Sequence, residues 1–349
     1  MALSRLLPAS FEQPNPTNFI INGDCSVSQR STSETGVTSS GYKTVDRFRP
    51  SLGTAGTWTI TQSTDVPTGQ GFANSLKFDC TTANSSLSAG SDMALQYRFE
   101  GQDLQLLKKG TSSAVPVTLS FWVKSTKTGT FICELKDDDN SRQISKAYTI
   151  SSSNTWEKKE LTFAGDTTGA LDDDNAKSLT ILWWQVAGAN FNNPSGTLNT
   201  SWAGSVSASN RAIGQVNIAD DVANDWLITG VCLNEGSHAI SFPHESFAEN
   251  LAKCHRYYQE VSMGAFYINS LGTDYIYRSL LLPVKPRATP TIAVHTQFQY
   301  YSGGNAANFT PTFGVSGDGL AHQHVVVFGS SLTNANGLYT GTFSADAEL

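Results

Sequence analysis

Four of the seven tryptophans occupy positions where an indole face could meet a ligand. Trp202 stands alone in NTSWAGS, within a polar stretch over 189–225 that is rich in Asn, Ser and Gly. Indole faces stack on the apolar face of a sugar ring, and neighbouring Asn and Asp side chains bind its hydroxyls. We therefore take Trp202 as the leading ligand-binding candidate, followed by Trp122, Trp183 and Trp184. The alternative is that these indoles fill a core, the common fate of tryptophan.

Two histidines form the one pair whose spacing suits a metal. His322 and His324 are two residues apart, so on a strand their side chains project from the same face. Three chains meeting on a threefold axis would bring six imidazoles around one transition metal ion. The alternative is a pair of surface histidines beside an apolar strand.

Acidic residues gather in two runs, Asp137 to Asp139 and Asp172 to Asp174. Carboxylate oxygens are ligands that Ca²⁺ prefers, so either run is a candidate calcium loop. Neither run has the Gly and Glu spacing of a known calcium loop, which favours solvated turns between strands. We predict no obligatory cofactor.

Aromatic residues cluster around the expected helix and the start of the last β unit, at Tyr257, Tyr258, Phe266 and Tyr267. Tyrosine contributes a large contact area at low entropic cost and is enriched in interfaces. The cluster indicates either a joint between domains or an interface between subunits.

Catalytic motifs are absent from the sequence. No GxSxG, HExxH, GxGxxG or phosphate-loop pattern occurs, and the six histidines form no spaced set. We therefore predict that the protein is not an enzyme. A glycosidase stays open as an alternative, because its two carboxylates can lie far apart in sequence.

The composition limits the classes of partner that we expect for this protein. The net charge is −7, the pI is near 5.3, and no Lys or Arg cluster is dense enough to follow a row of phosphates, so we expect no nucleic acid. No apolar run reaches the roughly 18 residues that span a bilayer, so we expect no membrane insertion.

The five cysteines show no CxxC spacing, and Cys80, Cys133 and Cys232 fall in apolar strand patterns, where buried thiols are expected.

Alternating apolar and polar residues dominate the chain and predict an all-β fold. In VTLSFWVKS, for example, Val117, Leu119, Phe121 and Val123 share one face. About eight such strands precede residue 237, enough for a jelly roll. One helix follows, because Ser246 and Glu249 form a capping box before apolar residues at helical spacing. Strand patterns then resume, so we predict a jelly-roll β-sandwich, a short helix and a C-terminal β-sandwich domain.

Segments at both ends of the chain resemble a family of tailed-bacteriophage tail-fibre and virion structural proteins. NFIINGDCSVSQRS and GYKTVDRF resemble its start, and WLITGVCLNEGSHAISFPHESFAENLAKCHRYYQ resembles its last sandwich strand, short helix and aromatic pair. PVKPRATPTIAV and FSADAEL resemble its C-terminal β domain, although Pro286 stands before Arg287 where a methionine is common. TWEKKELTF is similar to jelly-roll modules that bind carbohydrate, but fold similarity alone transfers no ligand.

The resemblance implies a domain order and a function. We expect a virion-anchoring arm over 1–17, a carbohydrate-binding-like jelly roll over 18–237, a helical connector over 238–262 and a C-terminal β domain over 263–349. The protein would be a tail fibre or receptor-binding subunit in the virion, assembled in the bacterial host cytoplasm. Its partners would be two further copies in a homotrimer, other virion proteins through the arm, and host surface glycans.

Three alternatives stay open at this stage. A capsid-attached fibre or decoration protein would need the same folds. A polysaccharide-cleaving depolymerase would show a groove with two carboxylates roughly 5 to 9.5 Å apart. A sugar-binding module of a cellular enzyme is the third, although the chain offers no catalytic partner.

Overall fold

The computed structural model describes residues 18–204, 208–268, 275–302, 305–309, 312–315, 324–330 and 337–349. The expected arm over 1–17 lies outside the described residues. The fold is all-β, as predicted, and every strand pair is antiparallel. Among the described helices, none has the length and apolar character needed to cross a membrane.

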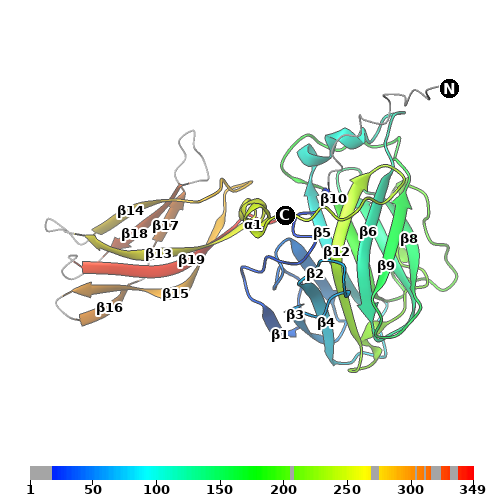
Figure 1. The fold of residues 1–349 in the computed structure, drawn as a ribbon, viewed down its shortest axis with the longest axis horizontal. Coiled ribbons are helices and arrows are strands. Elements are labelled where there is room, and N and C mark those ends of the chain that lie inside the picture. Colours follow the sequence, from blue (N-terminus) through cyan, green and yellow to red (C-terminus); the bar gives the residue numbers. More distant parts are fainter. Residues whose placement is uncertain are drawn as a thin grey trace, which may run out of the picture.

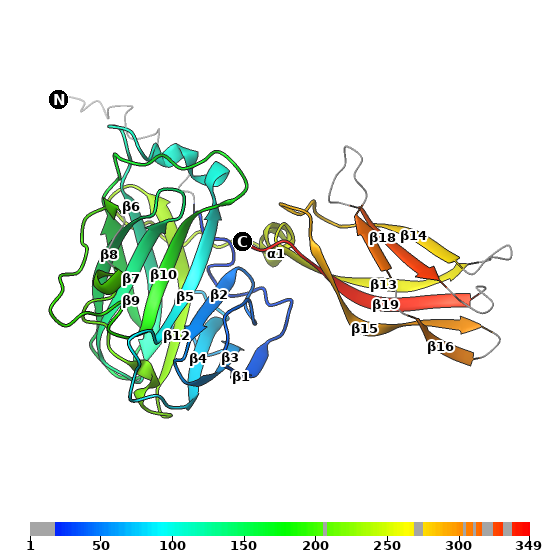
Figure 2. The ribbon, with the colours of Figure 1, turned by 180° about the vertical axis from the view of Figure 1, so that it is seen from behind.

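The first part of the chain forms a sandwich of two six-stranded sheets (Figures 1 and 2). Sheet A has the order β1 (Ser33–Val37), β3 (Thr57–Ser63), β4 (Ser75–Thr82), β12 (Asp225–Glu235), β6 (Val117–Ser125) and β9 (Glu157–Phe163). Sheet B has the order β11 (Ala203–Gly204), β8 (Arg142–Ile150), β7 (Gly129–Asp137), β10 (Lys177–Ala187), β5 (Asp92–Glu100) and β2 (Phe48–Gly53). Three short helical turns lie in the connections, at η2 (Gly101–Leu107), η3 (Ala208–Asn210) and η4 (Ile218–Asp220).

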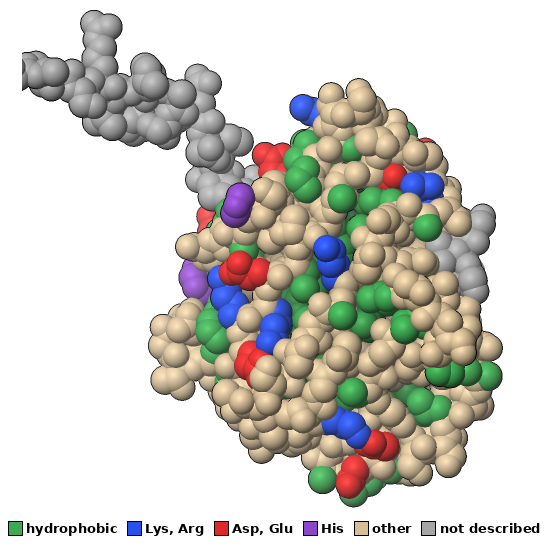
Figure 3. Space-filling view, turned by 90° about the vertical axis from the view of Figure 1, so that its right-hand side faces the viewer, with side chains coloured by type: hydrophobic (Ala, Val, Ile, Leu, Met, Phe, Trp, Pro, Cys, Tyr) green, Lys and Arg blue, Asp and Glu red, His purple; other side chains and the backbone are tan. Residues whose placement is uncertain are grey.

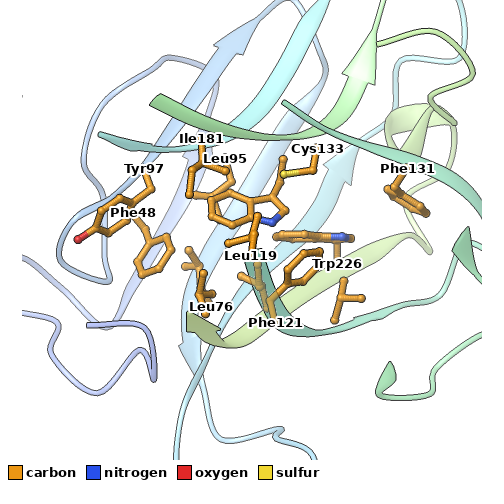
Figure 4. Packing of buried hydrophobic residues seen from close by; sticks show 14 of the residues in the cluster. Phe48, Leu76, Leu95, Tyr97, Leu119, Phe121, Phe131, Cys133, Ile181 and Trp226 are labelled. Carbon is orange, nitrogen blue, oxygen red and sulfur yellow. The ribbon is translucent and has the colours of Figure 1, made fainter. Parts of the chain in front are cut away.

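The core lies between the two sheets and follows the predicted alternation. All four inward residues of β6, from Val117 to Val123, are buried, and Cys80, Cys133 and Cys232 are buried free thiols, as expected. Figure 4 shows Leu95 and Ile181 of sheet B facing Leu119 and Trp226 of sheet A. Because each strand has one inward apolar face, its outward face is left for other contacts.

The sequence patterns found eight of the sandwich strands and missed others. β2 and β8 were not expected, because Pro50 interrupts the first and polar residues fill RQISKAYTI. β2 is an edge strand, the place where a sheet accepts proline.

Helix α1 (Phe247–His255) follows the sandwich and confirms the predicted capping box. The Glu249 amide donates to Ser246 Oγ at 3.3 Å, and the Ser246 amide donates to Glu249 Oε2 at 3.1 Å. Two smaller sheets follow, which we call the C-terminal unit (Figure 1). One contains β13 (Tyr258–Ile268), β19 (Gly337–Asp346), β15 (Thr291–Ser302) and β16 (Asn305–Phe309), and the other contains β14 (Tyr275–Leu281), β18 (His324–Ser330) and β17 (Thr312–Val315).

A buried charged contact connects the sandwich to the C-terminal unit, and we call it the joint. Its centre is an ion pair between Arg47 and Glu348, whose side chains are 1% and 4% exposed. The Arg47 guanidinium carbon lies 3.4 Å from the centroid of the Tyr257 ring. Beside it, Arg30 lies 3.7 Å from the Tyr258 ring centroid and forms ion pairs with Asp346 and Glu348.

Candidate functional site

A groove on the outward face of sheet B brings charged, amide, hydroxyl and aromatic side chains together in one concave surface. It has a volume of about 220 Å³. Strands β2, β5, β7 and β10 and the connection after β10 supply its lining: Ser51, Asp92, Ala94, Gln96, Arg98, Lys136, Asp138, Lys177, Thr180, Leu182, Trp184, Phe191 and Arg211. Pockets that enclose a drug-sized ligand measure roughly 300 to 1,000 Å³, so this groove suits a short stretch of an extended ligand.

Strand alternation explains why these residues meet. In β5, Met93, Leu95 and Tyr97 point into the core, so Asp92, Gln96 and Arg98 project outward. In β10, Ile181 and Trp183 are core residues, so Thr180, Leu182 and Trp184 face the groove.

One end of the groove is aromatic but closed to stacking. Trp184 is 2% exposed, and its ring lies against Phe191 at 5.2 Å between centroids. The Arg211 guanidinium lies 5.3 Å from the Trp184 ring centroid. Glu134 holds both partners, because it accepts hydrogen bonds from Trp184 Nε1 and Arg211 Nε, each at 2.9 Å. The indole therefore supports the groove from below instead of presenting a face to a ligand.

In another part of the groove, the carboxylate of Asp138 has hydrogen-bond donors from the protein itself. Asp138 accepts hydrogen bonds from Lys136 Nζ at 2.6 Å, Lys177 Nζ at 2.8 Å and Thr180 Oγ1 at 2.6 Å. Burial would raise the pKa of Asp138, but these hydrogen bonds outweigh burial and lower it. Asp138 is therefore an ionised anchor for two lysines that border the groove.

Two arginines share an amide oxygen farther along β5. Gln96 Oε1 accepts from Arg98 Nη2 at 2.9 Å and from Arg49 Nη1 at 3.1 Å. Arg98 Nη1 also donates to the main-chain oxygen of Leu349, so the C-terminal unit touches this end of the groove. Burial and the charge of Arg98 lower the pKa of Arg49.

The groove carboxylates are too far apart to act as a glycosidase pair. Asp92 pairs with Ala187 of β10, and Asp137, which precedes Asp138, pairs with Leu179. Those β10 positions are eight residues apart, about 26 Å at the rise of a strand. Glu134 lies between them, and its four-residue spacing from Asp138 corresponds to about 13 Å. A glycosidase needs roughly 5 to 9.5 Å.

The structure corrects the ligand-binding prediction for Trp183. Its side chain is fully buried between the sheets, where it packs on Phe48 and Phe121. It belongs to the core because β10 is the third strand from the β2 edge of sheet B, and Leu179, Ile181 and Trp183 face inward. Trp184 does line the groove, although its ring faces are covered.

Trp202 and Trp122 lie away from the groove lining. Trp202 is half-buried, donates from Nε1 to the Ala164 carbonyl at 2.7 Å and has Lys109 Nζ at 5.0 Å from its ring centroid. Trp122 is half-buried on the outward side of sheet A, opposite Thr229 and Lys158 in the strand register. The groove itself was missed because its residues are polar and come from four strands. The available signal was the run of outward polar residues in DMALQYRFE.

The predicted aromatic interface residues fall into two groups. Tyr257 and Tyr258 are buried in the joint. Phe266 and Tyr267 lie on β13, and their side chains are outside the described part of the chain.

The metal predictions find no support among the described residues. There, no group of three or more His, Cys, Asp or Glu side chains could hold a metal ion. His322 lies outside the described residues, and His324 begins β18 with its side chain undescribed. In the first acidic run, Lys109 pairs with Asp137, and lysines 136 and 177 pair with Asp138.

On one side of the sandwich, charged side chains are sparse and of both signs. Figure 3, which faces the right-hand side of Figure 1, shows Lys, Arg, Asp and Glu side chains separated by uncharged surface. That face presents no continuous basic track of the kind that follows a nucleic acid backbone.

Comparisons with known proteins found structural similarity only. No protein-family model matches the sequence, and no curated protein matches it. The enzymatically active domain of tailspike protein 4 from bacteriophage CBA120 matches with 14% identity and a TM-score of 0.31, over 62% of this chain and 21% of that one. The family 11 carbohydrate-binding module from Clostridium thermocellum, solved with a mixed-linked tetrasaccharide, matches with 13% identity and a TM-score of 0.27, over 60% of this chain and 99% of that one. The module TmCBM61, solved with β-1,4-galactotriose, matches with 10% identity and a TM-score of 0.30, over 62% and 97% of the two chains. Similarity at this level does not say what this chain binds.

Proposed function

We propose that this chain is a glycan-binding structural protein of a tailed-bacteriophage virion, a tail fibre or receptor-binding subunit whose sheet B groove contacts host surface glycans. The observation that carries the glycan part is the groove itself. Its floor is sheet B, and its walls offer carboxylate, amide, hydroxyl, ammonium and guanidinium groups within one concave surface. Sugar hydroxyls both donate and accept hydrogen bonds, so such a mixed polar surface suits them.

The groove favours hydrogen bonding over ring stacking. Arg211 and Phe191 cover Trp184, so the described lining has no free indole face. A short groove that relies on polar contacts exposed to water gives weak single-site binding, because each such hydrogen bond replaces one with water. Repeated copies on a virion would raise the overall avidity, which is where the proposed homotrimer contributes.

The phage part of the proposal rests on the sequence resemblance and on where its segments lie. The opening segment meets the segment around α1, because the Asn22 amide donates to Asn250 Oδ1 at 3.0 Å. It also meets the last segment through the ion pairs of Arg30 with Asp346 and Glu348. Three separate stretches that resemble one family thus build one joint. A capsid-attached fibre or decoration protein would share this joint, and gold-labelled antibodies in electron micrographs of the virion would distinguish tail from capsid.

We propose a binding role without catalysis for the groove. The wide spacing of Asp92, Glu134 and Asp138 supports this over depolymerase activity. Release of reducing ends from host envelope polysaccharide by the purified protein would overturn it.

A groove-filling variant tests the binding site. Ser51 is half-buried, faces the groove on edge strand β2 and pairs with Ala94, so Ser51→Trp would place an indole over the groove floor. We expect it to abolish binding to host surface polysaccharide in a pull-down. Thr61→Trp is the matched control, since Thr61 is a half-buried, outward residue of β3 in sheet A. Equal binding by both variants would refute the groove as the site.

A further inference from the structure

One carboxylate of the groove has no partner in the part of the chain that the structure describes. Among the described residues, Asp92 takes part in no ion pair and accepts no hydrogen bond from a side chain or backbone amide, although its residue is half-buried. The other two acids at the groove have partners: Asp138 accepts three hydrogen bonds, and Glu134 accepts two. A carboxylate that is partly removed from water and lacks a partner is costly to keep, and such groups mark functional sites.

The strand register explains why Asp92 has no partner. Its cross-strand neighbours are Gly53 on β2 and Ala187 on β10. Directly paired residues project from the same face of a sheet, so these are the side chains that would reach Asp92 first. One has no side chain and the other has a methyl group, and neither can donate a hydrogen bond.

Gly53 also creates the space that the carboxylate fills. A Cβ atom at position 53 would lie 2.2 Å from Asp92 Oδ1, closer than any real contact. The carboxylate therefore lies across the backbone of β2, beside Ser51 on the groove wall, in a position that only glycine at 53 permits. Burial raises the pKa of Asp92, with the charge of Arg211 acting in the opposite direction.

We infer that Asp92 is the residue that selects the sugar: its two carboxylate oxygens accept hydrogen bonds from two adjacent hydroxyls of a neutral glycan residue. This inference rests on the proposed function and assigns a ligand class to that groove. A carboxylate is an acceptor only, and a vicinal diol supplies two O–H donors at matching separation. An acidic sugar at the same position would place two negative charges together, so Asp92 also disfavours uronate and sialate residues there.

Two substitutions test the role by different routes. Asp92→Asn keeps the shape and replaces one acceptor oxygen with a donor. Gly53→Ala leaves Asp92 in the sequence but displaces its carboxylate. The matched controls are Asp79→Asn, at an exposed acid that pairs with Lys77 on β4 of sheet A, and Gly90→Ala, whose added Cβ would meet nothing closer than 3.8 Å.

The experiment is titration calorimetry with full-length protein against xylohexaose, cellohexaose, β-1,4-galactotriose, mannohexaose and an oligogalacturonate. We expect the wild type to bind a neutral member and not the oligogalacturonate. Asp92→Asn and Gly53→Ala should each weaken that binding by roughly 10- to 100-fold, the range for a hydrogen bond to a charged group. Both controls should bind like the wild type.

The outcomes separate this inference from the proposed function. If Ser51→Trp abolishes binding while Asp92→Asn and Gly53→Ala leave it unchanged, the groove is the site and the role of Asp92 is refuted. Stronger binding of the oligogalacturonate than of any neutral member refutes it as well. If the wild type binds none of the five probes, or if Ser51→Trp binds as well as the wild type, the groove proposal fails first. Circular dichroism of each variant shows whether a loss reflects unfolding.

Discussion

Removing one charge from the joint should detach the C-terminal unit without unfolding the sandwich. The perturbation is Glu348→Gln, which leaves the Arg47 guanidinium buried without its ionic partner. Arg47 is 1% exposed, and its other contacts include a hydrogen bond to the Arg98 carbonyl at 2.7 Å and the rings of Tyr257 and Tyr97. A neutral amide can accept one hydrogen bond from Arg47 but cannot balance its charge.

The magnitude follows from the burial of both partners. Breaking a buried pair costs about 3 to 5 kcal/mol, because one charge is left uncompensated away from water. An exposed pair contributes about 0 to 1 kcal/mol. The chain offers such a pair as a control: Lys253 and Glu245 form an ion pair with side chains that are 47% and 38% exposed. Glu245→Gln should therefore have little effect.

Two assays read the two parts of the chain separately. All seven tryptophans lie between positions 58 and 226, so their fluorescence reports on the sandwich alone. Trypsin reports on the joint, because Arg256 follows α1 and its guanidinium pairs with Glu100 at 2.6 Å. We expect Glu348→Gln to speed cleavage after Arg256 by at least roughly a hundredfold, which corresponds to about 3 kcal/mol of lost docking. The tryptophan emission and its urea midpoint should stay close to those of the wild type.

The reasoning is refuted if Glu348→Gln and Glu245→Gln are cleaved at the same rate. It is refuted in a different way if Glu348→Gln shifts the tryptophan unfolding midpoint as far as it shifts cleavage, since the joint would then be part of the sandwich core. The double variant Arg47→Met with Glu348→Met adds a third check. In this double variant the C-terminal unit should dock on the sandwich more stably than in Arg47→Met or Glu348→Met alone, because a well-packed apolar pair leaves no uncompensated charge.

Three further predictions follow from the same contacts. The lowered pKa of Asp138 means that its stabilising effect is complete above about pH 4, the unfolded value, and is lost as the pH falls through the folded value. Asp138→Asn should therefore lower the urea midpoint of tryptophan emission at about pH 7, and its difference from the wild type should disappear as the pH falls below the folded value; an unchanged midpoint at that neutral pH would show that this anchor does not contribute. Trp202→Ala should destabilise the sandwich by about 2 kcal/mol in urea, less than the roughly 3 to 5 kcal/mol of a fully buried tryptophan, and should leave glycan binding unchanged. Trp122→Ala, on the outward side of sheet A, should likewise leave binding unchanged in calorimetry, and a loss of binding would move the site to that sheet.

Periodicity predicted the parts of the fold that a single strand determines. The inward faces of β4, β5 and β6 and the capped helix were predictable because each depends on residues a few positions apart. The edge strand β2 escaped because proline and polar residues hide its alternation. Trp183 was misplaced because adjacent tryptophans on a strand face opposite sides, and the sequence does not say which side is the core.

The groove could not be predicted because it depends on which strands become neighbours. Ser51, Asp92, Lys136 and Thr180 come from β2, β5, β7 and β10, and only the order of sheet B brings them together. The same order places Gly53 and Ala187 at the sides of Asp92, and neither of these neighbours can donate a side-chain hydrogen bond to it. The spacing of these residues in the sequence does not indicate which strands become neighbours.

The segments that carry the sequence resemblance form the joint, whereas the groove is built from other parts of the chain. The segments that resemble phage virion proteins meet through contacts such as Asn22 with Asn250 and Arg30 with Asp346, at the end of the sandwich. None of the groove residues from Asp92 to Arg211 belongs to those segments. The resemblance therefore concerns how the sandwich is attached to the C-terminal unit, and it leaves the ligand open. A chimera that takes strands β5, β7 and β10 from another protein with the same joint segments should consequently change glycan preference, while the resistance to tryptic cleavage after Arg256 stays the same. A change in both would mean that the groove and the joint are coupled through Arg98, which touches Gln96 on one side and Leu349 on the other.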